Sequence, residues 1–406
     1  MIPGRAAAPG RNDRNDAGDG RAPRAQNSSL DFLSDIERLL VTMKPLLLLF
    51  VLLGGSAFAQ NATRNVLLVT LDGLRWQEVF RGADEAYIDL AGGGVPENQI
   101  KATRAAWLAP TAGERRGKLM PFLWGEIATR GQIFGNRDRG APMQVANVEW
   151  FSYPGYNELL CGFADPLVTS NLPIPNRNVT VLEWLNGRPG FGGRVAGCTT
   201  WQIFPAIVNV GRSRLPLWVS GSTHAALAPK SPVFAEIARW MEDIPTKSND
   251  EHYDGFAFRA ALEMIDVVRP RVLYVALGEP DTNAHARRYG AYLDSIRRCD
   301  RFLRELWERL QSLEHYRGTT TLLVTTDHGR GRTPQDWKDH NKKTPGSNET
   351  WLAVLGPDTA PRGERTDTPP VISAQVAATV AALLGENFAL ADARIAAPVA
   401  DVLPRR

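Results

Sequence analysis

The 406-residue chain is poor in cysteine and histidine, the residues on which cross-linked and zinc-stapled domains depend. It contains three cysteines, Cys161, Cys198 and Cys299, and six histidines. Three thiols are too few for a disulfide-dense scaffold or a cysteine-rich zinc module, so both classes are excluded. Because there are only six histidines, the position of each one can be weighed separately.

A strong charge of one sign is also absent. The chain has 47 basic and 44 acidic residues, and its net charge is +3. This balance gives no reason to expect a nucleic acid duplex as a partner. Apolar residues make up 43% and charged residues 22%, close to the globular average, so the chain as a whole is not disordered. Its length allows one large domain or two to three smaller ones.

The N-terminal residues lack the pattern of a folded domain. Residues 1–42 have six basic and six acidic residues and little apolar periodicity, so we expect disorder or a start-site artefact. Residues 43–59 resemble a secretory signal peptide, with a positive start, an apolar run at Leu46–Leu53 and a small-x-small site at Ala57–Ala59.

No apolar run is long enough to span a bilayer: Leu46–Leu53 is too short, and no later stretch approaches the roughly 18 residues required. We therefore expect a mature chain of residues 60–406 that is periplasmic or secreted, without stable membrane insertion after cleavage. An uncleaved N-terminal anchor is the alternative. No sequence pattern indicates an oligomeric state.

Beyond residue 60, strand and helix patterns alternate. Continuous apolar runs are typical of parallel strands buried on both faces, and they occur at 66–71, 194–198, 217–220, 272–277, 321–325 and 351–355. Helical patterns are found at 233–244, 256–268, 291–313 and 371–384. This alternation predicts an α/β fold with a mostly parallel central sheet flanked by helices. The polar, glycine-rich stretch 84–117 is expected to form loops at the edge of a functional site.

Candidate metal ligands lie at strand ends or in a loop that leads to a strand, and open α/β sheets bind ligands at the carboxyl ends of their strands. They are Asp72, Asp281, His285, Asp327, His328 and His340. Three carboxylates and three imidazoles suit two divalent ions, since a zinc ion takes three or four protein ligands. Two ions about 4 Å apart can clamp the attacking and leaving oxygens of an in-line displacement. The N and O ligand set favours Zn²⁺, with Mn²⁺ as the alternative.

Each of these residues also has an ordinary interpretation. An Asp before Gly at a strand end is usually a turn residue, and a lone His is more often a satisfied loop or core residue. We give that interpretation to the other histidines, His224, His252 and His315. The joint placement at successive strand ends is what favours a metal site.

The candidate nucleophile is Ser152, in a segment that runs from Trp150 to Glu158. Pro154 suits a first helical turn and Glu158 suits the N-terminal end of a helix dipole, so Ser152 is predicted at a helix start. There the N–H groups and the dipole would favour an alkoxide and hold an anionic oxygen. The alternative is an ordinary N-cap serine, because the hydroxyl needs a base or a metal to become nucleophilic.

Five motifs in order resemble the alkaline phosphatase superfamily. The chain looks closest to the nucleotide pyrophosphatase/phosphodiesterase branch and related phosphoglycerate mutase-like metalloenzymes. The motifs are Leu71-Asp72-Gly73, Ser152 to Glu158, Pro280-Asp281-x-x-x-His285, Thr326-Asp327-His328-Gly329, and His340 ahead of Trp351 to Pro357. The resemblance covers about Asn65 to Ala381.

The resemblance implies a role for each candidate residue. Ser152 occupies the position of the nucleophile. One ion would be held by Asp281, His285 and His340. The other would be held by Asp72, Asp327, His328 and Ser152. The implied fold is an alkaline phosphatase-like sandwich with a cap insertion, which we expect between about residues 165 and 270 of the catalytic domain 60–406.

The chain departs from the family pattern in three places. The phosphodiesterase branch usually has Pro-Asn-His after its nucleophile, whereas this chain has Pro154-Gly155-Tyr156. In that branch an Asn that contacts the phosphate lies some twenty residues after the nucleophile. Here Asn171 comes just before that position and Asn176 just after it, so both are candidates. The phosphate-binding Arg of the phosphatase branch has no assignable counterpart.

The expected function is that of an exported two-metal hydrolase of phosphate mono- or diesters, which acts on a small phosphorylated substrate through a phosphoserine. A sulfatase-like hydrolase is one alternative, although Ser152 lacks the following Arg that formylglycine formation requires. A phosphoglycerate mutase-like enzyme is the second, although such enzymes are cytosolic and have a larger insertion. An inactive binding protein for phosphorylated ligands is the third.

Overall fold

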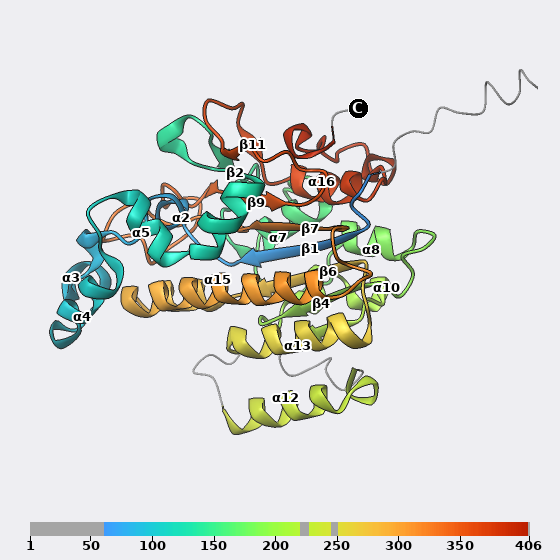
Figure 1. Ribbon diagram of the computed structural model, residues 1–406, viewed down its shortest axis with the longest axis horizontal. Coiled ribbons are helices and arrows are strands. Elements are labelled where there is room, and N and C mark those ends of the chain that lie inside the picture. The colour runs from blue at the N-terminus through green and yellow to red at the C-terminus, as the bar shows by residue number, and fades with distance from the viewer. Residues whose placement is uncertain (1–60, 220–226, 245–250, 405–406) are drawn as a thin grey trace, which may run out of the picture. The chain divides into compact units, whose positions relative to one another are not determined.

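The predicted alternation of strands and helices builds a large, mostly parallel sheet (Figure 1). The computed structural model describes residues 61–219, 227–244 and 251–404. The strand order is β10-β2-β9-β7-β1-β6-β4-β5. The strands are β1 (Asn65–Leu71), β2 (Gln132–Phe134), β4 (Val195–Thr199), β5 (Leu217–Val219), β6 (Val272–Leu277), β7 (Thr320–Thr325), β9 (Leu352–Leu355) and β10 (Gly363–Glu364). The predicted α/β class is confirmed.

The central strand β1 is buried along its whole length, because helices cover both faces of the sheet. Its side chains alternate between two cores: Leu67, Val69 and Leu71 face one, and Val66 and Leu68 face the other. The first core is covered by α13 (Asp254–Val267) and α15 (Tyr289–Ser312). The second is covered by α7 (Ser152–Cys161), α8 (Val181–Asn186) and α16 (Gln375–Leu383).

The remaining helices connect these layers, and none in the described part of the chain is long and apolar enough to cross a membrane. They are α2 (Trp76–Arg81), α3 (Leu90–Gly93), α4 (Glu97–Trp107), α5 (Ala112–Leu119), α6 (Ala128–Arg130), α9 (Phe204–Ile207), α10 (Val210–Ser213), α12 (Pro232–Asp243) and α14 (Glu279–His285). A second, small sheet has the order β11-β3-β8, formed by β3 (Met143–Gln144), β8 (Glu349–Thr350) and β11 (Val371–Ile372).

The direction of β9 corrects one prediction. The run 351–355 was expected to be a parallel strand, but β9 pairs antiparallel with both β7 and β2. Its first residue, Leu352, lies opposite Thr325 at the carboxyl end of β7. The loop that precedes β9 therefore arrives at the same sheet edge as the loops that follow β1, β6 and β7.

Two further predictions were wrong. The stretch 84–117 is not a set of loops, because it contains α3, α4 and most of α5. The helix predicted at 371–384 begins only at Gln375, because Val371 pairs with Met143 in the small sheet.

Other predicted segments fall partly or wholly outside the described residues. The segment of about 165 to 270, predicted to hold a cap insertion, supplies β4, β5 and α13 to the core, and α12 packs against α13. The described residues of this segment belong to the same compact unit as the rest of the catalytic domain. The predicted leader at residues 1–59 and His224 lie outside the described residues.

Candidate metal centre and nucleophile

Three neighbouring strand ends bring the predicted ligands to one edge of the sheet. In the register of β1, Thr70 pairs with Thr325 of β7, and Leu71 pairs with Leu277 of β6. The chain leaves these strands at Asp72, at the start of α14 and at Thr326, so the side chains that follow lie close together.

The deepest set is Asp72, Asp327 and His328, which we call the buried group. All three are buried, and one donor atom from each lies within 4.8 Å of the others. The Nε2 atom of His328 is 3.3 Å from Asp72 Oδ1 and 3.4 Å from Asp327 Oδ2. Its Nδ1 atom is 2.8 Å from the Gly329 carbonyl, which can only accept, so Nδ1 carries a proton. Burial acts to lower the pKa of His328, but the charges of Asp327 and Asp72 outweigh it and raise that pKa to about 9. A bound cation would favour the neutral ring, in which the lone pair of Nε2 faces the two carboxylates.

The carboxylates of the buried group fit a cation. Asp72 Oδ1 and Asp327 Oδ2 are buried and have no hydrogen-bond partner. Burial, and then the charge of Asp281, raises the pKa of Asp72. Burial, and then the charge of Asp72, raises the pKa of Asp327 well above its usual range. A divalent ion would offset both the cost of burying these carboxylates and the repulsion between them. The donor set therefore suits the metal ion that the sequence predicted.

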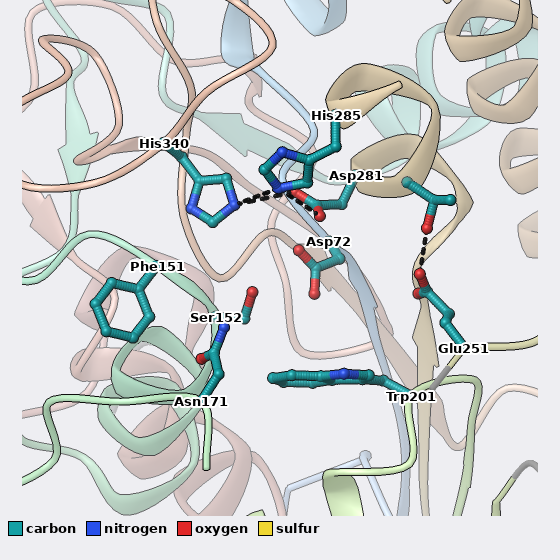
Figure 2. A pocket seen from close by; sticks show the side chains of 10 residues that line it. Asp72, Phe151, Ser152, Asn171, Trp201, Glu251, Asp281, His285 and His340 are labelled. Carbon is teal, nitrogen blue, oxygen red and sulfur yellow. Dashed lines mark hydrogen bonds and ion pairs between the residues drawn. The ribbon is translucent and has the colours of Figure 1, made fainter. Parts of the chain in front are cut away.

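The second set is Asp281, His285 and His340, which we call the rim group. Asp281 and His285 stand one turn apart on α14, and His285 Nε2 is 3.2 Å from Asp281 Oδ2. His340 comes from the loop before β9, and its Nε2 is 2.8 Å from the Nε2 of His285. Figure 2 shows these three side chains converging beside Asp72 and Ser152. His340 Nε2 also lies 3.5 Å from Asp281 Oδ1.

Protonation in the rim group also suits metal binding. Burial, and then the charge of His328, lowers the pKa of His340 well below its usual range, which keeps the ring neutral. Burial acts to raise the pKa of Asp281, but Arg330, His285 and His340 outweigh it and hold that pKa well below its usual range. His328 lies between the two groups, since Asp281, His328 and His340 also have donor atoms within 4.8 Å of one another.

Ser152 is the first residue of α7, as predicted, and its Oγ is 3.2 Å from His328 Nε2. The helix start offers fewer free N–H groups than expected. The N–H of Tyr153 donates to Asn171 Oδ1 at 3.0 Å, and Pro154 has no N–H. Because Oδ1 of Asn171 is occupied in this way, its Nδ2 group is available to donate into the pocket that it lines.

The structure distinguishes between the two asparagines that the sequence offered as substrate contacts. Asn171 lines the pocket beside Ser152 (Figure 2). Asn176 is only 2% exposed, and its Nδ2 donates to Asn157 Oδ1 and to the Ile207 carbonyl. Asn171 is therefore the candidate substrate contact, and Asn176 is structural.

Four of the six candidate ligands and Ser152 open onto a cavity of about 600 Å³. It is lined by Asp72, Phe151, Ser152, Asn171, Trp201, Glu251, Asp281, Thr282, His285 and His340. Sequence reasoning missed Trp201, Glu251 and Thr282. Trp201 lies just beyond the carboxyl end of β4, so the strand-end rule could have found it. Glu251 pairs with Trp201 through an isolated antiparallel bridge, for which the sequence has no local signal.

The side chains around Gly73, at the end of β1, leave no room for a larger residue there. Gly73 has φ +57°, and a Cβ atom there would lie 2.6 Å from Asp281 Oδ1 and 2.8 Å from an Arg330 nitrogen. Its N–H donates to Asp327 Oδ1 at 3.1 Å. The α14 N-terminus is held by Asp254, whose Oδ1 accepts from the Gly278 N–H at 2.7 Å.

A family model and several solved structures resemble this chain. Residues 193–383 match the model of the type I phosphodiesterase / nucleotide pyrophosphatase family. Wild-type alkaline phosphatase PafA is 11% identical with a TM-score of 0.52, over 86% of this chain and 100% of that one. An alkaline phosphatase superfamily protein from Vibrio parahaemolyticus is 12% identical with a TM-score of 0.50, over 85% and 72%. No curated protein shows a significant sequence match.

A third solved structure, the phosphonate monoester hydrolase SpPMH from Silicibacter pomeroyi, is 12% identical with a TM-score of 0.50, over 84% of this chain and 76% of that one. Identities this low indicate a shared fold.

Proposed function

We propose that the chain is a two-metal phosphodiesterase of the alkaline phosphatase superfamily, with Ser152 as its nucleophile. The support is the similarity of residues 193–383 to the type I phosphodiesterases and nucleotide pyrophosphatases, together with the shared fold. The observation that carries this proposal is the position of the Ser152 hydroxyl. Its Oγ lies 3.2 Å from His328 Nε2, on the pocket surface that it shares with Asp72 and Asp281.

The residues present fit two divalent ions. Asp72, Asp327, His328 and the Ser152 hydroxyl would hold one ion. Asp281, His285 and His340 would hold the other. Nitrogen and oxygen donors without a thiolate favour Zn²⁺, with Mn²⁺ as the alternative. When bound, such ions act as Lewis acids that lower the pKa of the nucleophilic hydroxyl and stabilise charge on the leaving oxygen.

Each residue of the pocket would then have its own part in the reaction. Ser152 Oγ would form a bond to phosphorus and release its proton to solvent, while one ester oxygen leaves with its electron pair. The phosphoryl group would then be carried on Ser152, together with the second ester group of a diester, until water hydrolyses the bond to Oγ. Asn171 Nδ2 would donate to a non-bridging phosphoryl oxygen and orient the group. Trp201 and Phe151 supply aromatic walls beside Ser152 (Figure 2), which would limit the access of water to the phosphoryl group.

The pocket favours diesters over monoesters on charge. Among the described residues that line it there is no Lys or Arg, so only the bound ions would offset substrate charge. A monoester dianion carries one more negative charge than a diester, in a pocket that also contains Asp72, Asp281 and Glu251. A phosphodiester is therefore the expected substrate class.

Matched aryl phosphate diesters, monoesters, phosphonates and sulfates, assayed on the zinc-loaded protein, test this proposal. We expect kcat/KM for the diester to exceed that for the monoester by about 10-fold or more. The reverse order would favour a phosphatase, and faster sulfate turnover would favour a sulfatase. Ion binding without turnover on any ester would favour a binding protein.

We further propose that the chain is exported and cleaved before Gln60. The support is the signal-like pattern of residues 43–59, which is a property of the sequence alone. N-terminal sequencing of natively expressed protein should give Gln60 in the periplasm or medium. Intact Met1 or Met43 on cytosolic protein would contradict export.

A further inference from the structure

Arg330 is a buried charge that the proposed mechanism does not use. It follows His328 by two residues and is 0% exposed. Burying a guanidinium is costly unless every donor is paired, so its partners indicate what it does. Sequence reasoning stopped at Asp327-His328-Gly329 and did not consider it.

The partners of Arg330 are one rim-group ligand, Asp281, and the backbone of the loop that leads to another, His340. One guanidinium nitrogen, Nη1, contacts Asp281 Oδ1 directly. The Nε atom donates to the Trp337 carbonyl at 3.0 Å, and Nη2 donates to the Lys338 carbonyl. Residues 337 and 338 belong to the loop that delivers His340. One side chain therefore joins the Asp281 carboxylate to the backbone just ahead of His340.

The contact leaves the two oxygens of Asp281 in different roles. Oδ1 is held by Arg330, whereas Oδ2 faces His285 Nε2 at 3.2 Å. The loop end of the link is itself fixed, because Trp337 is fully buried and its Nε1 donates to the Gly92 carbonyl at 2.9 Å. The planar fork of a guanidinium can span these three acceptors at once, which an ammonium cannot.

We propose that Arg330 is a positioning residue of the rim metal site, which fixes Asp281 as a one-oxygen ligand and fixes the loop that carries His340. The proposal rests on the proposed function, because it concerns the ion of the Asp281, His285 and His340 group. Outer-shell partners of metal ligands typically contribute about 10–100-fold to metal affinity. Arg330 acts on one site only, because none of its three hydrogen bonds reaches a ligand of the buried group.

Metal titration of the chelator-treated protein tests the proposal without relying on turnover. Zn²⁺ binding by calorimetry gives the affinity of each ion, and the visible spectrum of the Co²⁺ form reports the ligand geometry of each site. In Arg330→Met we expect one ion to bind as in wild type and the second to bind at least about 10-fold more weakly, with a changed Co²⁺ spectrum. Arg330→Lys should recover part of that loss. Arg332→Met, an exposed arginine from the same loop, is the control and should match wild type.

A double variant separates positioning from general destabilisation. If Arg330 acts in part through Asp281, the rim-ion affinity lost in Asp281→Asn with Arg330→Met should be smaller than the sum of the losses in the two single variants. Additive losses, or wild-type affinity for both ions in Arg330→Met, would overturn the inference. If Arg330→Met does not fold, Arg330→Lys decides, and unchanged rim-ion affinity there would also overturn it. A wild-type protein that binds no ion would instead refute the proposed function, and this inference with it.

Discussion

The two ligand groups of the candidate centre come from different kinds of structural element. The buried group takes all three ligands from the ends of β1 and β7, where paired central strands fix the backbone. The rim group takes Asp281 and His285 from the short helix α14 and His340 from a loop, and the His285 side chain is 48% exposed. Ligands on central strands need little further support, whereas ligands on a short helix and a loop need side chains that hold them.

The two groups also differ in charge. The buried group has two carboxylates, each with a buried oxygen that accepts no hydrogen bond, and a bound cation would satisfy both. The rim group has one carboxylate, and Arg330 already neutralises part of its charge. We therefore expect the buried group to bind its ion more tightly, and the rim group to depend more on residues outside the ligand set.

The largest expected effect is that of removing the nucleophile, which belongs to the buried half. Ser152→Ala should lower turnover by about 10³-fold or more, because water can replace the hydroxyl only in part. Ser152→Thr should keep measurable activity, since it retains the hydroxyl and adds one methyl group. Mass spectrometry after an acid quench should find phosphate on the Ser152 peptide. Turnover by Ser152→Ala near that of wild type would rule out this mechanism.

The next effect compares one histidine from each group. His328→Ala should remove one ion and cost about 10²-fold or more in turnover, because the cavity that it leaves is fully enclosed. His285→Ala should cost only about 10-fold, because water can reach the half-exposed position and act as a replacement ligand. Elemental analysis of both variants checks the ion content.

Alanine variants of the other ligands test the same comparison between the two groups. Asp72→Ala should empty the buried site, and Asp281→Ala or His340→Ala should empty the rim site. Equal losses of activity and ions in His328→Ala and His285→Ala would show that the two halves are not distinct. Full ion occupancy in all of these variants would refute the ligand assignment.

The strand-end ligands were the most predictable part of the centre. Asp72, Asp327 and His328 follow continuous apolar runs, and such runs indicate buried strands whose ends share an edge. His340 was a candidate because it lies in the loop that leads to a predicted strand, and what brings it to the same edge is the antiparallel direction of β9. A short apolar run does not encode the direction of its strand, so the sequence could not provide this.

The errors in the fold have equally local causes. The helix α4 has no buried residue, so it lacks the apolar stripe that would have revealed it. A signal for α5 was present, because Thr111 and Glu114 form a capping box. The choice between Asn171 and Asn176 depends on how a loop packs against Tyr153, which no local pattern specifies.

The third effect measures what burial does to a carboxylate outside the candidate centre. Asp300 on α15 is buried away from the centre and accepts hydrogen bonds from the Phe122 and Leu123 N–H groups, each at 2.9 Å. Burial raises its pKa to about 6. A raised carboxyl pKa contributes stability that is complete below about pH 4 and is lost as the pH rises through 6. The contribution lost is about 3 kcal/mol.

Denaturant unfolding at pH 4 and pH 7.5 tests this value. The free energy of unfolding of wild type minus that of Asp300→Asn should be smaller at pH 7.5 than at pH 4, because the asparagine does not titrate. A flat difference would mean that Asp300 ionises without cost. Buried carboxylates would then need no cation, and the contrast between the two metal groups would lose its electrostatic basis.

The smallest effect concerns Tyr156, which supports the buried group from α7. Its hydroxyl donates to Asp72 Oδ2 at 2.9 Å, and its ring packs on Phe204. Tyr156→Phe keeps the ring and removes the donor, so the affinity of the buried ion should fall by about 10-fold while the rim ion is unaffected. Tyr274→Phe is the matched control, because the buried Tyr274 hydroxyl lies 2.9 Å from Thr70 Oγ1 and contacts no ligand. Both variants should lose about 1 kcal/mol of stability, the usual value of one hydrogen bond, but only Tyr156→Phe should weaken ion binding. Equal ion affinities in the two variants would mean that the strand end alone fixes Asp72, and that the buried group needs no support beyond the sheet.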